Sequence, residues 1–276
     1  MNAFTVIGAG GFIGARLVQA LQARGMAVHA SRRGDDSLFD RDLGCVFYCA
    51  GLTGDFDVRP FDTVAAHVGL VAELLARGRF DRLIYLSSTR LYDSLGAAGG
   101  REDDRLMFDP AARRNVYDLS KALGENLTLA RSEGRGAVAR LSNVFDLDPA
   151  ASGFLSELLQ RASGERRIDL KASAPSAVRD YIHADDVIAG LLAMADRKAE
   201  GVVNIARGEN LSNRQLAELF DAAGWRLELG PDRELPQAPV CDTARLRSLG
   251  VAPRDVREVL AEILSRIGGG LGPGLG

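Results

Sequence analysis

The chain lacks the features that would mark a membrane, secreted or zinc-binding protein. No apolar run approaches the roughly 20 residues that a membrane-spanning helix needs, so we expect no membrane partner. No basic segment precedes the first apolar run, Phe4–Ile7, which argues against a signal peptide. The three cysteines are odd in number and lack the spacing of a zinc site, so we expect no metal. Together these absences favour a reducing, cytoplasmic location.

A strong excess of one charge is also absent. The 34 basic and 37 acidic side chains give a net charge of −3, which argues against a general nucleic-acid binder. The basic side chains are almost all arginine, and only three are lysine.

Strand-like and helical segments alternate over the first half of the chain. Apolar runs of strand length are separated by segments in which apolar residues recur at helical spacing. This alternation predicts an α/β fold with a doubly wound parallel sheet of the Rossmann type. The predicted strands are Phe4–Ile7, Ala27–Ser31, Val46–Ala50, Leu83–Leu86 and Ala137–Leu141, and the helices among them are Phe12–Arg24, Thr63–Ala76 and Asn115–Arg131.

A glycine-rich turn follows the first predicted strand and opens the first helix. Its sequence is Gly8-Ala-Gly-Gly11-Phe12-Ile13-Gly14. Glycines permit a tight turn and a close approach of a pyrophosphate, and the helix N-terminus supplies free N–H groups and a positive dipole. These residues are therefore candidates for binding a dinucleotide, with a plain glycine turn before a helix as the alternative.

The second and third predicted strands end in further candidate cofactor contacts. Arg32 and Arg33 follow the second strand, where an NAD site usually has an acidic residue and where Arg suits a 2′-phosphate. We therefore favour NADP (as NADPH) over NAD, with solvated loop charges as the alternative. Ala50 and Gly51 end the third strand and are expected to line the same site.

Tyr117 and Lys121 form the most informative pair in the chain. A Tyr-x-x-x-Lys pair would arise by chance in about one such chain in twenty, so the other motifs must support it. Spacing i, i+4 places both side chains on one helix face. We expect the ammonium to lower the pKa of the phenol and make Tyr117 a proton donor or acceptor near neutral pH.

Four further motifs, in order and spacing, resemble those of the extended short-chain dehydrogenase/reductases, in their NAD(P)-dependent nucleotide-sugar epimerase/dehydratase family. Leu83–Tyr92 resembles the family strand that ends in a catalytic Ser. Arg140-Leu-Ser-Asn143-Val-Phe, Arg179-Asp-Tyr-Ile-His183-Ala-Asp185-Asp186-Val and Gly201-Val-Val-Asn204-Ile resemble the later motifs. The resemblance covers nearly the whole chain.

The resemblance implies a role for each matched residue. Catalysis would fall to Ser88, Tyr117 and Lys121, with Tyr117 transferring the proton and Lys121 also holding the cofactor ribose. Asn143 and Arg179 would bind the substrate together with Ser88 and Thr89, and Arg179 would hold a diphosphate. Three hydroxyls stand in a row, so Ser87 or Thr89 is an alternative to Ser88. Strand alternation places Ser88 on the face opposite to these two.

The pattern along the chain predicts a domain layout, and the resemblance implies a homodimer. We predict a NAD(P)-binding Rossmann domain over residues 1–145, a smaller substrate-binding lobe over 146–267 with some segments returning to the first domain, and a disordered glycine-rich tail over 268–276. The dimer would form through a four-helix bundle of Thr63–Ala76 and Asn115–Arg131. The candidate contact residues are Ala66, Leu70, Leu74, Leu119, Leu123 and Leu127.

Three reactions share this scaffold, and the sequence discriminates among them. Dehydratases of the family carry an Asp-Glu pair where this chain has Thr89-Arg90, which argues against dehydration. A preference for NADP favours a reductase that acts on a keto group of a nucleotide-linked sugar. The alternatives are an NAD(P)-dependent epimerase and a non-catalytic, NADP-binding regulatory protein.

Other polar residues favour structural roles. His183 is expected to be packed and hydrogen-bonded, and Asp185 and Asp186 to cap the helix that follows them. His67 stands where the family often has Asn, so no role transfers to it directly.

Overall fold

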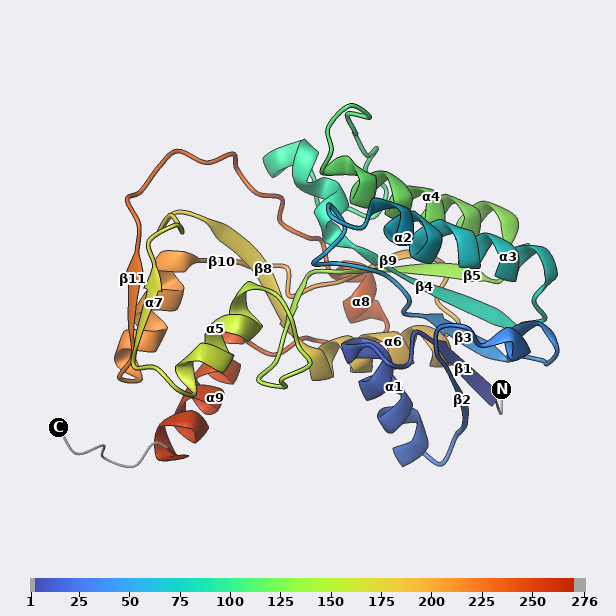
Figure 1. Cartoon of the computed structure of the whole chain (residues 1–276), viewed down its shortest axis with the longest axis horizontal. Helices are drawn as coiled ribbons and strands as arrows, with labels where there is room; N and C mark the ends of the chain where they lie inside the picture. Colours follow the sequence, from blue (N-terminus) through green and yellow to red (C-terminus); the bar gives the residue numbers. More distant parts are fainter. Residues whose placement is uncertain (1–2, 271–276) are drawn as a thin grey trace.

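The computed structural model describes residues 3–270 and shows two packed regions (Figure 1). The larger region is built on a parallel sheet of six strands in the order β2-β1-β3-β4-β5-β9. This confirms the predicted doubly wound α/β fold. The strands are β1 (Ala3–Ile7), β2 (Ala27–Ser31), β3 (Cys45–Tyr48), β4 (Arg82–Ser88), β5 (Gly136–Leu141) and β9 (Gly201–Ile205).

Helices cover both faces of this sheet, because alternate side chains of each buried strand point to opposite faces. On one face, Val6 and Phe47 pack with residues of α1 (Phe12–Ala23) and α6 (Ala184–Asp196). On the other face, Val46 and its neighbours pack against α3 (Leu70–Arg77). The helices α2 (Pro60–Val64) and α4 (Asn115–Arg131) complete this second layer (Figure 1).

The predicted helix Thr63–Ala76 is interrupted. A π-helical turn, Ala65–Gly69, separates α2 from α3. Such turns place one extra residue in the helix and often occur at functional sites. Here the turn carries His67, whose side chain is fully buried.

The second region forms from the later part of the chain and has its own core. It contains a three-stranded sheet in the order β10-β8-β6 and a two-stranded sheet of β11 and β7. Trp225 is buried in this core and donates its indole N–H to the carbonyl of Ala162 at 2.9 Å. The strands are β6 (Asn143–Phe145), β7 (Arg167–Leu170), β8 (Val178–His183), β10 (Asn210–Ser212) and β11 (Arg226–Leu229), and the helices are α5 (Phe154–Ala162), α7 (Asn213–Ala222) and α9 (Val256–Gly270). The short helix α8 (Ala244–Ser248) instead packs on the large sheet, through Leu246.

The chain crosses between the two regions more than once. β6 leads from the large sheet into the smaller region, and α6 and β9 return to the large sheet. The helix α9 runs to Gly270, three residues into the predicted tail, and the rest of that tail lies outside the described residues. Among residues 3–270, no helix is long and apolar enough to cross a bilayer.

Candidate functional site

The glycine-rich turn leaves no room for side chains at two of its positions. Gly8 has a φ of +86°, and a Cβ there would lie 2.7 Å from the amide nitrogen of Ala50. A Cβ at Gly14 would overlap the carbonyl oxygen of Gly8. The turn therefore packs tightly on the end of β3 and on the start of α1.

The N-terminus of α1 suits the pyrophosphate of a dinucleotide. Gly11 stands at the N-cap with no side-chain cap, and the first turn of the helix holds no acidic residue. The free N–H groups and the helix dipole thus face no competing negative charge at this end. Phe12 and Ile13 are half-buried at the start of the helix. These features fit the dinucleotide that the sequence predicts.

The end of β2 lies against the same turn. The amides of Gly8 and Ala9 donate to the carbonyl of Ser31 at 3.1 and 3.0 Å. Arg32 and Arg33 follow directly and are exposed, so both guanidinium groups are free to turn towards a ligand. The sequence prediction that they contact the cofactor stays a prediction.

Nearby, His29 lies between two charged side chains, Asp35 and Arg41. The sequence did not indicate this contact. The Nε2 of His29 lies 2.7 Å from Asp35, and its Nδ1 lies 2.7 Å from Arg41. Hydrogen bonds, chiefly from Ser37, lower the pKa of Asp35 to about 2. These contacts fix the loop after β2, on which Arg32 and Arg33 lie.

Tyr117 and Lys121 are both buried on α4. The ammonium of Lys121 donates to the carbonyl of Leu86 on β4 at 2.8 Å, which fixes it at the end of that strand. Burial lowers the pKa of Lys121 to about 8. Burial also raises the pKa of Tyr117, and a hydrogen bond with Ser88 and the charge of Arg90 oppose that rise. The expectation that Lys121 lowers the pKa of this phenol is therefore wrong for this structure.

Gly51 joins this pair to the glycine-rich turn. A Cβ at Gly51 would lie 3.2 Å from the ammonium nitrogen of Lys121 and 3.0 Å from Nε2 of His67. Ala50, the preceding residue, is the one that Gly8 approaches. The end of β3 is thus shared by the predicted cofactor turn and the predicted catalytic pair, as expected where parallel strands end at a common edge.

His67 also lies in this site, although the sequence assigned it no role. Its Nδ1 lies 2.8 Å from the hydroxyl of Ser120, and its ring meets the ring of Tyr117 edge-on at 5.2 Å. Burial, assisted by the charge of Lys121, lowers the pKa of His67 to about 2. The imidazole is therefore neutral at physiological pH and packs against the phenol without adding charge.

Arg90 and Phe56 enclose Tyr117 from the other side. The Arg90 guanidinium carbon lies 4.9 Å from the centre of the Tyr117 ring and 4.6 Å from that of Phe56. Phe56 itself packs on Tyr117 at 5.4 Å. Arg90 occurs in the segment that excluded dehydration, but its sequence position did not reveal this contact.

The remaining predicted site residues lie on β4, β6 and β8. Ser88 is half-buried and accepts a hydrogen bond from the amide of Arg90 at 3.2 Å, whereas Thr89 is buried. Asn143 donates to the carbonyl of Asp180 at 2.9 Å. Arg179 is half-buried and stacks on Phe154, with its guanidinium carbon 4.8 Å from the ring centre.

A buried polar network explains several other motif residues. Arg140 makes two hydrogen bonds to Glu125, at 2.9 and 2.6 Å, and one to the hydroxyl of Tyr92 at 2.8 Å. Tyr92 in turn donates to Asn204 at 2.8 Å. The network joins β5, α4, β9 and the segment after β4. These residues fix the backbone around the site, since each buried polar group has a partner.

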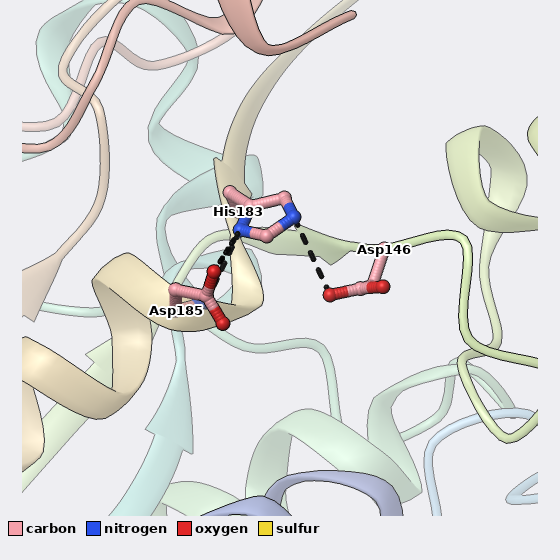
Figure 2. Close-up of side chains that lie close together, drawn as sticks. All are labelled: Asp146, His183 and Asp185. Atoms are coloured by element: carbon pink, nitrogen blue, oxygen red, sulfur yellow. Dashed lines mark hydrogen bonds and ion pairs between the residues drawn. The ribbon is translucent and has the colours of Figure 1, made fainter. Parts of the chain in front are cut away.

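A second cluster of polar side chains gathers around His183, between α6 and the loop after β6 (Figure 2). Its Nε2 lies 3.3 Å from Asp146 and its Nδ1 lies 3.4 Å from Asp185. Arginines face both carboxylates: Arg16 lies 2.9 Å from Asp146 and 3.1 Å from Asp185, and Arg254 lies 3.6 Å from Asp185. The two guanidinium groups supply the positive charge that a metal ion would bring.

His183 is hydrogen-bonded, as expected, but it also caps α6. Its Nδ1 accepts the amide N–H of Asp185 at 3.2 Å, which makes His183 the N-cap residue. Asp185 and Asp186 therefore lie in the first turn of the helix, and neither is its N-cap. In that turn their charges interact favourably with the helix dipole.

The fold and the site define a class of protein. A glycine turn at the first strand of a parallel sheet, beside a buried Tyr-x-x-x-Lys helix, is the arrangement of a dinucleotide-dependent short-chain dehydrogenase/reductase. The chain belongs to the NAD-dependent epimerase/dehydratase family, whose sequence profile matches residues 4–206. It is therefore an enzyme of the NAD(P)-dependent kind.

Two curated relatives and one solved structure illustrate the similarity. The dTDP-6-deoxy-L-talose 4-dehydrogenase (NAD(P)(+)) of Kitasatospora kifunensis is 29% identical over 306 residues, covering 94% of this chain and 93% of that protein. The dTDP-4-dehydro-6-deoxy-D-allose reductase of Streptomyces bikiniensis is 25% identical over 290 residues, covering 88% and 87%. The structure of RMD from Pseudomonas aeruginosa complexed with NADPH has a TM-score of 0.77 at 24% identity, covering 98% and 100%, and supports the fold.

Proposed function

We propose that this enzyme uses NADPH to reduce a keto group of a nucleotide-linked deoxysugar, with Tyr117 as the proton donor. The observation that carries the proposal is the convergence of Ser88, Tyr117 and Lys121 beside the glycine-rich turn, through the contacts of Gly51. The two curated relatives act on dTDP-linked deoxysugars, as their names state, and supply the substrate class.

The residues of the site have complementary tasks in this reaction. NADPH, when bound at the glycine turn, supplies hydride for the substrate carbonyl carbon. Ser88 accepts the amide N–H of Arg90 and hydrogen-bonds Tyr117, and in the reaction its O–H would donate to the carbonyl oxygen beside that phenol. Tyr117 gives its phenolic proton to that oxygen as negative charge develops on it. Burial keeps this phenol protonated and therefore ready to donate.

Lys121 and Arg179 would hold the two ligands. Lys121 is buried and directed towards Gly51, where it can hydrogen-bond the cofactor ribose. Arg179 has one guanidinium nitrogen that is buried and has no hydrogen-bond partner within the described chain. A diphosphate would satisfy such a donor, because guanidinium groups bind phosphate oxygens in pairs.

Turnover assays test this function directly. The purified protein is incubated with NADPH or NADH and a panel of nucleotide-linked 4-keto-6-deoxysugars, and any cofactor that co-purifies is identified. We expect oxidation of NADPH that depends on one of these sugars. Tightly retained NAD, together with interconversion of sugars that consumes no added cofactor, would instead identify an epimerase. A protein that binds NADPH but turns over no sugar of the panel would favour the regulatory alternative.

We also propose that the enzyme is a homodimer through α2, α3 and α4. Apolar side chains on α2 and α4 are exposed in the single chain, with Phe61 88% exposed. The others are Val64, Leu119, Leu123 and Leu129. The predicted contact Leu74 was wrong, because it is fully buried in the core of its own chain, and Leu70 and Leu127 pack on the same core.

Light scattering at micromolar concentration tests the dimer. We expect twice the mass of the chain, and we expect the double variant Phe61→Glu and Leu123→Glu to be a folded monomer. A parent protein with the mass of a single chain would exclude this assembly.

A further inference from the structure

The contact between Arg90 and Tyr117 has no role in the function proposed above. The guanidinium lies across the faces of two aromatic rings, Tyr117 and Phe56, at 4.9 and 4.6 Å from their centres. A planar cation over an aromatic face is attracted by the ring electrons, and more strongly where water is partly excluded. The Arg90 side chain is 25% exposed, so its charge is only partly screened.

Three contacts fix the guanidinium in this place. Its Nε lies 3.1 Å from the carboxylate of Asp118, which is buried on α4 next to Tyr117. Its Nη2 donates to the carbonyl of Arg114 at 3.3 Å. Phe56 supports it from the far side. The charge therefore belongs to the wall of the site and is not a mobile surface arginine.

The groups around the phenol differ in the charge that they can offer. His67 is neutral, because burial holds its pKa near 2, and Ser88 supplies a hydrogen bond without charge. Asp118 is an anion that disfavours the phenolate, whereas Arg90 is the cation that lowers the pKa of Tyr117. Lys121 lies one helical turn further along α4 and is directed to Leu86 and Gly51.

We propose that Arg90 is a positioning residue for the reaction: its guanidinium, fixed across the rings of Tyr117 and Phe56, supplies the positive charge that stabilises Tyr117 when its phenol gives up a proton. This inference rests on the proposed function, in which Tyr117 is the proton donor. It assigns to Arg90 part of the electrostatic task that the sequence had assigned to Lys121. The reverse reaction, oxidation of the sugar alcohol, needs Tyr117 as the base and depends on the same charge.

The test follows the ionisation of Tyr117 directly. Tyrosine labelled with ¹³C at Cζ gives resonances for five tyrosines, and Tyr117→Phe identifies the one that belongs to Tyr117. The midpoint of its titration is measured in the full chain, in Arg90→Met and in Arg90→Lys. Arg113→Met serves as the control, since Arg113 is 83% exposed in the same part of the chain.

We expect Arg90→Met to raise the titration midpoint by about one pH unit or more, the usual effect of removing an opposite charge within about 4–6 Å. Arg90→Lys should restore part of the shift, and Arg113→Met should match the parent. With active enzyme, the ascending limb of the pH profile for sugar-alcohol oxidation should move to higher pH in Arg90→Met by the same amount, because Tyr117 must be ionised to act as the base. A structural role alone would lower turnover without moving this limb.

Two results would overturn the inference. One is a midpoint for Tyr117 that is the same in the parent and in Arg90→Met. The other is a parent phenol that does not ionise below the pH at which the chain unfolds, because the charge of Arg90 would then be too weak to act. Both readings come from the resonance and need no substrate. If the enzyme turned over no sugar of the panel, the proposed reductase function would be contradicted. The titration of Tyr117 would still show whether the charge of Arg90 lowers the pKa of this phenol.

Discussion

The two polar clusters around His183 and around Tyr117 differ in whether every buried charge has an ion-pair partner. Around His183, each carboxylate faces a guanidinium, and the contacts join α1, α6 and the loop after β6. Around Tyr117, the buried Lys121 has a carbonyl partner but, within residues 3–270, no ion-pair partner. Paired charges add little net energy but are costly to break, whereas an unpaired buried charge weakens the fold.

The difference suggests which cluster maintains structure and which performs chemistry. Groups whose pKa values are displaced by burial without a compensating partner concentrate at functional sites. Removing a member of the His183 cluster should therefore cost stability and spare turnover. Removing the unpaired charge of Lys121 from the Tyr117 cluster should do the reverse.

Lys121→Met is expected to have the largest combined effect on turnover and on the free energy of unfolding. Turnover should fall by at least ~10², since the cofactor ribose loses the ammonium proposed to hold it in place. The folded chain should nevertheless gain about 1–3 kcal/mol at neutral pH, because burial lowers the pKa of Lys121. Turnover assays and urea denaturation measure the two effects. A loss of stability at neutral pH would contradict the idea that this charge is unfavourably buried.

The same variant makes a prediction about pH. The pKa of Lys121 is about 8 in the folded chain, against an ordinary value of 10.5. Between these values the unfolded chain binds the proton more strongly, so this group makes the parent more stable as pH rises from 8 towards 10.5. Lys121→Met should lack that rise. Urea midpoints measured at intervals through this window, in parent and variant, would show whether the two curves converge as expected.

Asp146→Asn tests the structural role of the His183 cluster. It should lower the free energy of unfolding by about 1–3 kcal/mol, because Arg16 and His183 lose their charged partner. Turnover should stay within about twofold of the parent, since this paired cluster takes no part in the proposed chemistry. The matched control is Asp196→Asn, which breaks the exposed pair with Arg24 and should cost no more than about 0.5 kcal/mol. Equal effects of the two variants would contradict the structural role of the cluster.

The smallest effect concerns the choice of cofactor. We expect NADPH to bind at least about tenfold more tightly than NADH, a difference of about 1.4 kcal/mol, through the guanidinium of Arg32. Arg32→Ala should remove this preference and leave the affinity for NADH unchanged. Binding titrations with both cofactors measure it. Equal affinities in the parent would refute the assignment of Arg32 and strengthen the case for an epimerase.

The sequence predicted those parts of the site that depend on local patterns. Gly8 and Gly14 are required by close backbone approaches, and a glycine motif between a strand and a helix indicates such approaches directly. The helix Asn115–Arg131 was predicted with its observed bounds, because its helical spacing is regular. The sequence therefore placed Tyr117 and Lys121 correctly on one face of this helix.

The parts that the sequence missed depend on irregular backbone or on contacts between distant segments. The π-helical turn that buries His67 changes the helical register by one residue, and no spacing pattern in the chain indicated it. Arg90 reaches Tyr117 only because the segment after β4 folds back over α4. The short strands of the smaller region, such as β7 and β10, have three or four residues, too few for a period to be recognised.

The most direct test of the account is the turnover of Tyr117→Phe. This variant removes the phenolic proton and keeps the ring that packs between His67 and Phe56. We predict that kcat for reduction falls by ~10²–10⁴, the usual size of a general acid contribution, while NADPH affinity and stability barely change. Full turnover by Tyr117→Phe, on a sugar that the parent reduces, would show that the proton comes from another group and that the catalytic assignment is wrong.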